Sequence, residues 1–273
     1  MSEKNREAKR SAREALQEQR AKEKARAKRK RTFVVAGGVV AVLAIAAVVG
    51  VLVADHQDSN DSSPSGAVAA PAGATGKDNL VIPVGAANAP SVLTIYEDFR
   101  CPACDQFEKQ FTPTIHSLED SGQMRTEYHL VTLIDGNLGG SGSLKAANAA
   151  ACAQDAGKFR AFHDVLYTNQ PDEQTDSFGD NNNLLTLAGK VSGLKTPTFT
   201  ACVNNGTHQG WVKKSNTAFG DSGFNSTPTI LLNGKTVYGS STATLTPDSL
   251  KQMVATANKG KQPGTVTATP QSS

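Results

Sequence analysis

Hydrophobic and β-branched residues form short runs in two regions of the chain, residues 80–133 and residues 229–238. The predicted strands are residues 80–84, 91–97, 126–133, 229–232 and 236–238. Pro83 suits the first run to the edge of a sheet, where a missing backbone N–H is tolerated. Asn233-Gly234 separates the last two runs, and Asn-Gly between β-prone runs is the strongest short-range signal for a hairpin.

Between these runs, apolar residues recur at the spacing of amphipathic helices. A first helix follows Cys101, with Phe107 and Phe111 on one face, and Pro113 should kink or divide it. The other predicted helices are residues 144–156, 158–167 and 184–191, a fourth from Pro197 onward, and a last one from Pro247 onward.

The last helix should turn Leu250, Met253 and Val254 toward the core. The order of elements is a strand, a strand–helix–strand unit, a helical block over about residues 140–223, and a strand–strand–helix unit. This order predicts one α/β domain over residues 80–258.

Charge is distributed unevenly along the 273 residues. Residues 1–31 hold thirteen Lys and Arg and five Asp and Glu, a net charge of +8. The whole chain is +3, so residues 32–273 carry −5. The positive excess belongs to one basic segment, and we expect no nucleic-acid partner.

An apolar run without a charge occupies residues 33–54. As a helix it would extend about 33 Å, enough to cross a hydrocarbon core of ~30 Å. The alternative is a cleaved signal peptide, whose apolar core is usually only ~7–15 residues long. We predict a transmembrane anchor over residues 32–54, with the basic residues before it in the cytoplasm and everything after it extracytoplasmic.

The segment after this anchor is rich in Ser, Ala, Gly, Pro and Asp. Residues 55–79 show no apolar periodicity and are predicted to be a flexible linker. A similar composition predicts a disordered tail over residues 259–273. The remaining residues suffice for one folded domain, which we expect to be a monomer.

Cys101 and Cys104 enclose Pro102 and Ala103 where a predicted strand gives way to a predicted helix. Unpaired backbone N–H groups and the helix dipole stabilise a thiolate at a helix N-terminus, and the thiolate is the form that attacks disulfides. The alternatives are an inert disulfide or a zinc site, but the sequence contains no second Cys-x-x-Cys and no His-x3–5-His. We predict a redox-active pair, with no metal and no cofactor.

Cys152 and Cys202 lie far apart in the sequence. A disulfide between them would close a loop of 51 residues and stabilise the domain by roughly 4 kcal/mol on the chain-entropy estimate. An even number of cysteines in an exported domain favours such pairing. Two buried free thiols are the alternative. We predict that this pair serves stability.

Three segments resemble the DsbA-like thiol–disulfide oxidoreductases of the thioredoxin superfamily, in their membrane-anchored actinobacterial form. They are Glu-Asp-Phe-Arg-Cys-Pro-Ala-Cys at residues 97–104, Lys-Phe-Arg-Ala-Phe-His-Asp-Val-Leu at 158–166 and Ser-Thr-Pro-Thr at 226–229. The resemblance implies a thioredoxin fold with a helical insertion. It also implies that Pro228 is cis and that Thr227 and Pro228 bind an extended substrate beside the first cysteine.

The resemblance further implies a role for each cysteine. Cys101, exposed at the helix end, would form the mixed disulfide, and Cys104, buried one turn further, would resolve it in the reducing direction. The partners would be exported proteins with reduced cysteines and a quinone-linked membrane protein that reoxidises the pair. A reductase or isomerase of the same fold, and a tethered binding module with a structural disulfide, are the competing functions.

Two positions depart from the family pattern. Ile95 stands where the family often has an acidic residue that assists proton transfer, although Glu97 and Asp98 lie nearby. Ala103 stands where the strongly oxidising members have a histidine that stabilises the thiolate. We therefore expect an oxidant of intermediate strength.

A few other residues have side chains capable of chemistry or of substrate contact. His163 and Asp164 are expected at the surface or the edge of the core. Trp211 and Phe99 are expected to serve packing, with a place in a substrate groove as the alternative for each.

Overall fold

The computed structural model describes residues 68–238 and 245–266. The predicted basic segment and transmembrane anchor, residues 1–54, lie outside the described residues. Within the described ranges, no helix combines the length and the apolar character needed to cross a membrane.

A mixed sheet forms the centre of the domain, with strand order β1-β3-β2-β4-β5. The strands are β1 (Ile82–Val84), β2 (Ser91–Glu97), β3 (Met124–Leu130), β4 (Thr229–Leu232) and β5 (Lys235–Thr236). β2 runs parallel to β3 and antiparallel to β4. β1 lies at the edge of the sheet, as Pro83 predicted, and the hairpin at Asn233-Gly234 joins β4 to β5.

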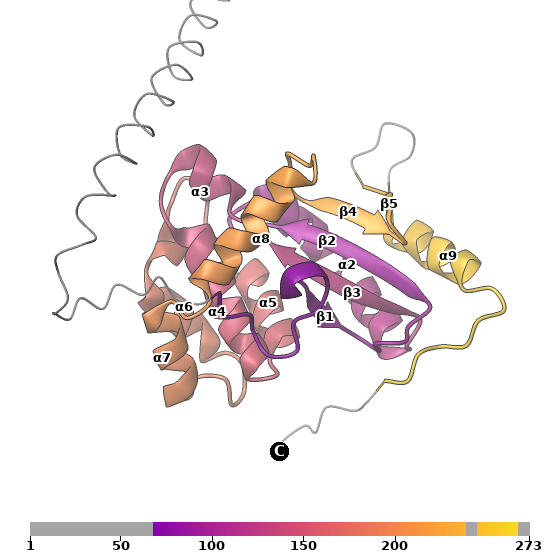
Figure 1. Ribbon diagram of the computed structural model, residues 1–273, viewed down its shortest axis with the longest axis horizontal. Coiled ribbons are helices and arrows are strands. Elements are labelled where there is room, and N and C mark those ends of the chain that lie inside the picture. The colour runs from indigo at the N-terminus through magenta and orange to yellow at the C-terminus, as the bar shows by residue number, and fades with distance from the viewer. Residues whose placement is uncertain (1–67, 239–244, 267–273) are drawn as a thin grey trace, which may run out of the picture. The chain divides into compact units, whose positions relative to one another are not determined.

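The helices pack on both faces of this sheet. They are α2 (Pro102–Asp120), α3 (Leu133–Leu138), α4 (Gly142–Asp155), α5 (Phe159–Thr168), α6 (Asn181–Ala188), α7 (Pro197–Asn205), α8 (Gln209–Asp221) and α9 (Pro247–Ala257), with short 3-10 turns at Lys77–Asn79 and Ser177–Gly179. Figure 1 shows α3–α8 toward the left end of the sheet, over both of its faces, and α9 at the right end.

The alternation of side chains along β2 explains how the two faces are covered. Leu93, Ile95 and Glu97 are buried on the face that α2 and α5 cover. Tyr96 points to the opposite face, where its ring lies 5.4 Å from that of Phe219 on α8. The strand thus ends between two helical layers and leads directly into Cys101.

The helix α2 is continuous through Pro113, so of the two predicted outcomes, a kink or a division of the helix, the division is wrong. A proline removes the hydrogen bond to the carbonyl four residues earlier, here that of Lys109. Both Pro113 and Lys109 are exposed, so water can solvate the freed carbonyl group. The opposite face of the helix, with Phe107 and Phe111, packs in the core.

The predicted inward face of α9 is only partly right. Leu250 and Val254 are buried, but Met253 is 37% exposed. Because Val254 lies four residues after Leu250, these two share one helix face, and Met253 falls on its border.

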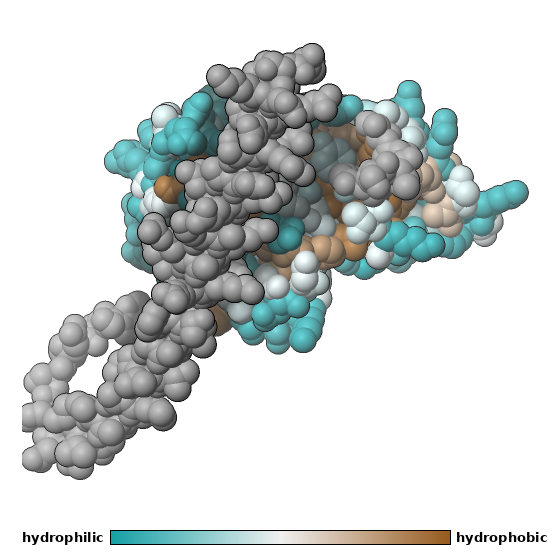
Figure 2. Space-filling model, turned by 90° about the horizontal axis from the view of Figure 1, so that it is seen from above, coloured by the Kyte–Doolittle hydropathy of each residue, from teal (hydrophilic) through white to brown (hydrophobic). Residues whose placement is uncertain are grey.

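Figure 2 shows hydrophilic side chains around much of the visible face, with some hydrophobic ones between them.

The flexible linker and the disordered tail were predicted too long. The backbone of Thr75 pairs with Val81, and Ala72 exchanges hydrogen bonds with Gln154 and Asp155 on α4. After α9, the backbone N–H of Gly264 donates to the carbonyl of Gly122 at 2.8 Å. Composition alone did not reveal these contacts, because the predicted linker and tail make them through backbone groups, which do not depend on residue type.

Candidate active site

Cys101 is the N-cap residue of α2, and Pro102 occupies the first turn. Proline suits this position because it has no N–H to leave unpaired and its φ is already helical. Cys104 follows within the first turn, on the buried side of the helix. Both cysteines carry free thiols.

Polar groups surround the Cys101 sulfur. The thiol donates to the carbonyl oxygen of Thr227 at 3.3 Å. A hydrogen bond from the Cys104 thiol, together with the Thr227 side chain and the backbone N–H groups of Cys104 and Ala103, lowers the pKa of Cys101 to about 6, although burial opposes this shift. At neutral pH the sulfur is therefore mostly the thiolate, the reactive form.

Cys104 has the opposite electrostatic environment. Its residue is only 1% exposed, and burial raises the pKa of its thiol well above the ordinary value. The neighbouring Cys101 adds to this rise. The two sulfurs thus form an asymmetric pair, with one anionic and the other protonated.

The loop that faces this pair contains a cis peptide bond between Thr227 and Pro228. It precedes β4, whose Thr229 pairs with Tyr96 at the end of β2. Thr229 Oγ1 also donates to the carbonyl of Ser226 at 2.7 Å. The structure therefore brings Thr227 and Pro228 beside Cys101 although the sequence separates them by more than a hundred residues.

The prediction that Cys101 is exposed at the helix end is wrong, because the residue is 6% exposed. The Thr227 loop covers it from one side, and Gln170 donates to the backbone carbonyls of Phe99 and Cys101 from another. Cys101 belongs to the buried hydrophobic cluster, but its sulfur keeps a polar contact to the carbonyl of Thr227. Pro102 and Ala103 beside it are exposed, so a partner can approach from that side.

A buried ion pair holds the residue before the motif. Arg100 is 2% exposed, and its Nη1 lies 2.6 Å from Asp135 Oδ1 and 3.1 Å from Asp176 Oδ1. Asp135 also accepts from the backbone N–H groups of Ser143 and Leu144 at the start of α4. Arg100 thereby ties the cysteine loop to the helical insertion.

Asp98 fixes the same loop from inside. Its carboxylate accepts from the backbone N–H groups of Arg100 and Ile134, and burial raises its pKa to about 6. Sequence reasoning did not predict these supports. The charged residues directly before Cys101 were the available signal, but Asp98 and Arg100 also bind groups that lie 35 or more residues away.

A second buried cluster lies behind the cysteines. His163 is 2% exposed, against the expectation of a surface or core-edge residue, and its Nε2 lies 2.9 Å from Glu97 Oε1. Groups of Glu97, Glu108 and His163 lie within 4.8 Å of one another. Both ring nitrogens of His163 already face carboxylates, Glu97 and Asp164, so the geometry favours an ion pair over a metal site.

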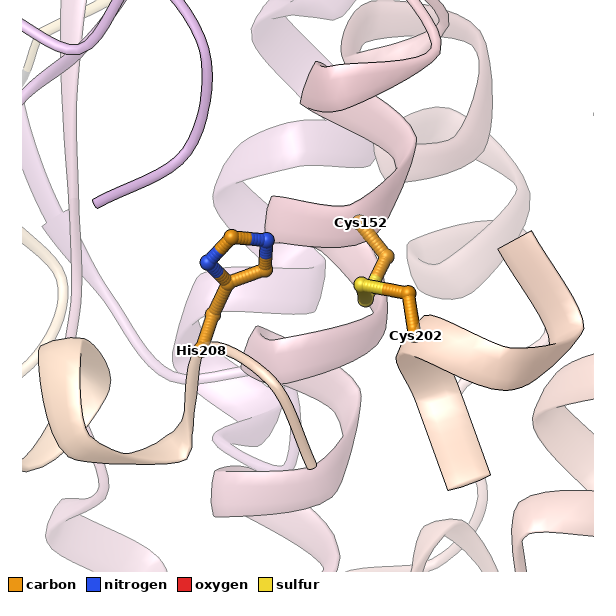
Figure 3. A group of neighbouring side chains, drawn as sticks. All are labelled: Cys152, Cys202 and His208. Carbon is orange, nitrogen blue, oxygen red and sulfur yellow. A yellow bond between two sulfur atoms is a disulfide. The ribbon is translucent and has the colours of Figure 1, made fainter. Parts of the chain in front are cut away.

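The other two cysteines form a disulfide between α4 and α7. The Cys152 and Cys202 sulfurs are 2.02 Å apart, and Figure 3 shows this bond with the ring of His208 beside it. His208 lies between the carbonyl of Ala69 and the carboxylate of Asp155, each 2.8 Å from a ring nitrogen. The site is a structural crosslink without a free thiolate to hold a metal.

The expectations for the large aromatic residues agree with the structure. Trp211 is 0% exposed, and its indole N–H donates to the carbonyl of Asn79 at 2.6 Å. Phe99 is 1% exposed and packs against the ring of Tyr167 at 5.1 Å. Both residues serve the core.

A central sheet that leads into Cys-Pro-Ala-Cys at a helix N-terminus, with a cis-proline loop facing it, defines the class of thioredoxin-fold redox proteins. Residues 77–255 match the family profile described as thioredoxin. A reduced disulfide bond oxidoreductase, DsbG, from Mycobacterium tuberculosis is 30% identical, with a TM-score of 0.56. The match covers 67% of this chain and 89% of that one.

Two curated relatives extend this comparison. Disulfide bond formation protein D of Bacillus subtilis is 26% identical over 181 residues, which cover 65% of this chain and 77% of that protein. The serine/threonine-protein kinase PknE of Mycobacterium tuberculosis is 27% identical over 154 residues, or 54% of this chain, and the match spans only 27% of the kinase. This chain belongs to the thioredoxin family, among the DsbA-like thiol–disulfide oxidoreductases.

Proposed function

We propose that this chain forms disulfides in exported proteins by donating a disulfide from Cys101 and Cys104. A substrate thiolate attacks Cys101 and breaks the bond to Cys104, which leaves with the electron pair. A second substrate thiolate then attacks the substrate sulfur and releases Cys101 as a thiolate. The substrate is oxidised by two electrons, and the cysteine pair is reduced.

The asymmetry of the two sulfurs carries this proposal. A thiol with a low pKa leaves more readily, and the pKa of Cys101 is lowered to about 6. Its stabilisation as a thiolate favours the reduced form of the pair and hence donation of the disulfide. Without a histidine at Ala103, the hydrogen bonds and the helix N-terminus supply this stabilisation, which supports an oxidant of intermediate strength.

The Thr227-Pro228 loop is the proposed substrate site. Thr227 is 9% exposed, and its carbonyl lies beside the Cys101 sulfur. An extended peptide can pair with the backbone of such a loop in the manner of an added strand. Pro102 and Ala103, both exposed, would form the adjoining surface.

The proposed location is outside the cytoplasm, with residues 32–54 as a single-pass anchor. We propose further that residues 1–31 stay in the cytoplasm, that residues 55–67 connect the anchor to the domain, and that the chain acts as a monomer. A quinone-linked membrane protein would return the pair to the disulfide form. The resemblance to anchored family members and the apolar sequence support these points.

The test is oxidation of a reduced, unfolded protein by the oxidised chain, followed over several turnovers with an added oxidant. Turnover supports the proposal, and stoichiometric binding without turnover would favour a tethered binding module. An isomerase would instead rearrange wrongly paired disulfides faster than it forms new ones. Capture of partners in cells by a Cys104→Ala variant would then identify the substrates.

A further inference from the structure

Gln170 follows α5 and binds the backbone of the cysteine loop with its side chain. We propose that Gln170 is a positioning residue for disulfide exchange, whose amide holds the carbonyls of Phe99 and Cys101 so that the start of α2 stays aimed at the Cys101 sulfur. This inference deepens the proposed function and rests on it for its role in turnover.

The amide of Gln170 bridges two carbonyls of the loop. Its Nε2 donates to the carbonyl oxygen of Phe99 at 2.9 Å and to that of Cys101 at 3.0 Å. A primary amide has two N–H groups, so it can supply one to each carbonyl. Phe99 and Cys101 are 1% and 6% exposed, so water is poorly placed to replace this donor.

The two carbonyls differ in their other partners. Within the part of the chain that the structure describes, no other group donates to the Phe99 carbonyl. The Cys101 carbonyl also accepts from the backbone N–H groups of Cys104 and Asp105, both at 3.1 Å, which are the first hydrogen bonds of α2. Gln170 thereby fixes the carbonyl at which the helix begins.

The orientation of this helix start matters to the sulfur. The backbone N–H groups of Cys104 and Ala103 help to lower the pKa of Cys101 to about 6. Hydrogen bonds weaken steeply when donor and acceptor lose their alignment. Because Gln170 binds the carbonyl of Cys101, it acts on the sulfur through the backbone.

The segment that carries Gln170 is itself held in place. The backbone N–H of Gln170 donates to the carbonyl of Tyr167 at the end of α5 at 3.2 Å. Pro171 follows and restricts the backbone of Gln170 to extended conformations. Further along, Arg100 Nη2 donates to the carbonyl of Glu173 at 2.9 Å. The amide therefore acts from a fixed support.

Several titratable groups surround the Cys101 sulfur and would contribute to any pH profile. They are Asp98 and Arg100 before it, Cys104 and Asp105 on α2, Tyr167 on α5 and Glu173 in the loop after α5. Gln170 carries no charge, and all of these groups remain when it is replaced by an uncharged residue. A changed pKa then reports on the amide.

Two substitutions separate the hydrogen bonds of Gln170 from its bulk. Gln170→Met keeps the length of the side chain and removes the donor, and Gln170→Lys keeps a donor. In the reduced full chain, Gln170→Met should raise the pKa of Cys101 by roughly one pH unit, the effect of about one hydrogen bond to a charged group. Gln170→Lys should keep this pKa at or below the wild-type value. The ultraviolet absorbance of the thiolate against pH gives each value.

The raised pKa should alter rate and equilibrium at opposite ends of the pH range. Alkylation of Cys101 in Gln170→Met should be about fivefold slower than in the wild type at pH 6 and no slower above about pH 8, since only the thiolate reacts. At pH 8 the exchange of the reduced pair with glutathione disulfide, which yields the Cys101–Cys104 disulfide and two glutathione thiols, should favour the protein disulfide about ninefold more than in the wild type. At pH 5 the two equilibria should agree.

The matched control is Asn169→Leu. The amide of Asn169 binds the carbonyl of Val165 and the ammonium of Lys190, so its loss disturbs the same loop without touching the cysteine loop. Its Cys101 pKa should equal that of the wild type. Should Gln170→Met fail to fold, Gln170→Glu takes its place, with Asn169→Asp adding the same charge one residue away.

A Cys101 pKa in Gln170→Met equal to that of the control would overturn the inference. So would an equal rise in Gln170→Met and Gln170→Lys, because bulk rather than the donor would then matter. In the substitute pair, equal pKa values for Gln170→Glu and Asn169→Asp would overturn it as well. A wild-type chain that exchanges with glutathione but never oxidises an unfolded protein would contradict the proposed function instead.

Discussion

The two cysteine pairs of this domain differ in their chemistry: one pair is free and reactive, and the other is joined in a disulfide. Cys101 and Cys104 lie three residues apart at a helix N-terminus, and both sulfurs are free. Cys152 and Cys202 are 50 residues apart and joined between two helices of the insertion. The surroundings of each sulfur, rather than its burial, account for the difference.

Burial alone would not separate the pairs, since Cys101 is 6% exposed and Cys152 is 2% exposed. The Cys101 sulfur meets hydrogen-bond donors from Cys104, Ala103 and Thr227 that stabilise its anion. Cys152 lies on an alanine-rich helix, α4, and its sulfur is already bonded to Cys202. Hydrogen-bond donors thus stabilise the thiolate that Cys101 needs for disulfide exchange. Cys152 and Cys202 have no free thiolate, because their sulfurs are bonded to each other.

The largest expected effect is the loss of redox turnover on removing the active pair. Cys101→Ala should abolish oxidation of a reduced protein, because no sulfur remains to form the mixed disulfide. Cys104→Ala should accumulate covalent complexes with substrates, because nothing resolves them within the chain. Non-reducing gels and turnover assays measure both outcomes.

The matched control for these variants replaces the other pair. Cys152→Ala with Cys202→Ala should leave the rate of disulfide exchange at Cys101 close to that of the wild type. A comparable loss of turnover in this control would contradict the separation of the two roles.

The second effect concerns stability. Opening the loop that Cys152 and Cys202 close should lower the free energy of unfolding by roughly 4 kcal/mol on the chain-entropy estimate. Denaturant unfolding of the wild type and the double variant, both with the Cys101–Cys104 pair reduced, measures this difference. Equal unfolding midpoints would show that the crosslink contributes little.

A smaller effect is expected from Thr227→Val, which keeps the shape of the side chain and removes its hydroxyl. That hydroxyl oxygen is buried without a hydrogen-bond partner among the described residues, so the hydroxyl can donate to the Cys101 thiolate, whose pKa the Thr227 side chain lowers. Losing a hydrogen bond to a charged group should raise this pKa by roughly one pH unit. The ultraviolet absorbance of the thiolate against pH gives the value, and an unchanged pKa would assign the effect to the backbone donors.

Local patterns in the sequence predicted much of the fold. β2 covers the predicted residues 91–97 without a shift, because its alternation is regular and Cys101 follows it closely. The Asn233-Gly234 hairpin formed for a similarly local reason, since both residues have positive φ. Pro102 and Pro247 mark the observed starts of α2 and α9.

Features that depend on distant partners were predicted less well. His163 is buried because Glu97, 66 residues away, supplies a charge that its own helix does not reveal. Cys101 is covered by a loop 126 residues away, so its local sequence suggested an exposed end. The supports of Arg100 also come from distant segments, helix α3 and the loop that contains Glu173. Sequence patterns therefore located the cysteine motif, and the tertiary contacts define its environment.

The pH dependence of Cys101 alkylation tests the central claim most directly. With a small alkylating reagent and the reduced chain, the rate should rise as the pH increases through about 6 and level off above it, because only the thiolate reacts. Peptide mapping should find the modification at Cys101, with Cys104 unmodified over the same range. A midpoint near the ordinary value for a thiol, or equal modification of both cysteines, would contradict the account.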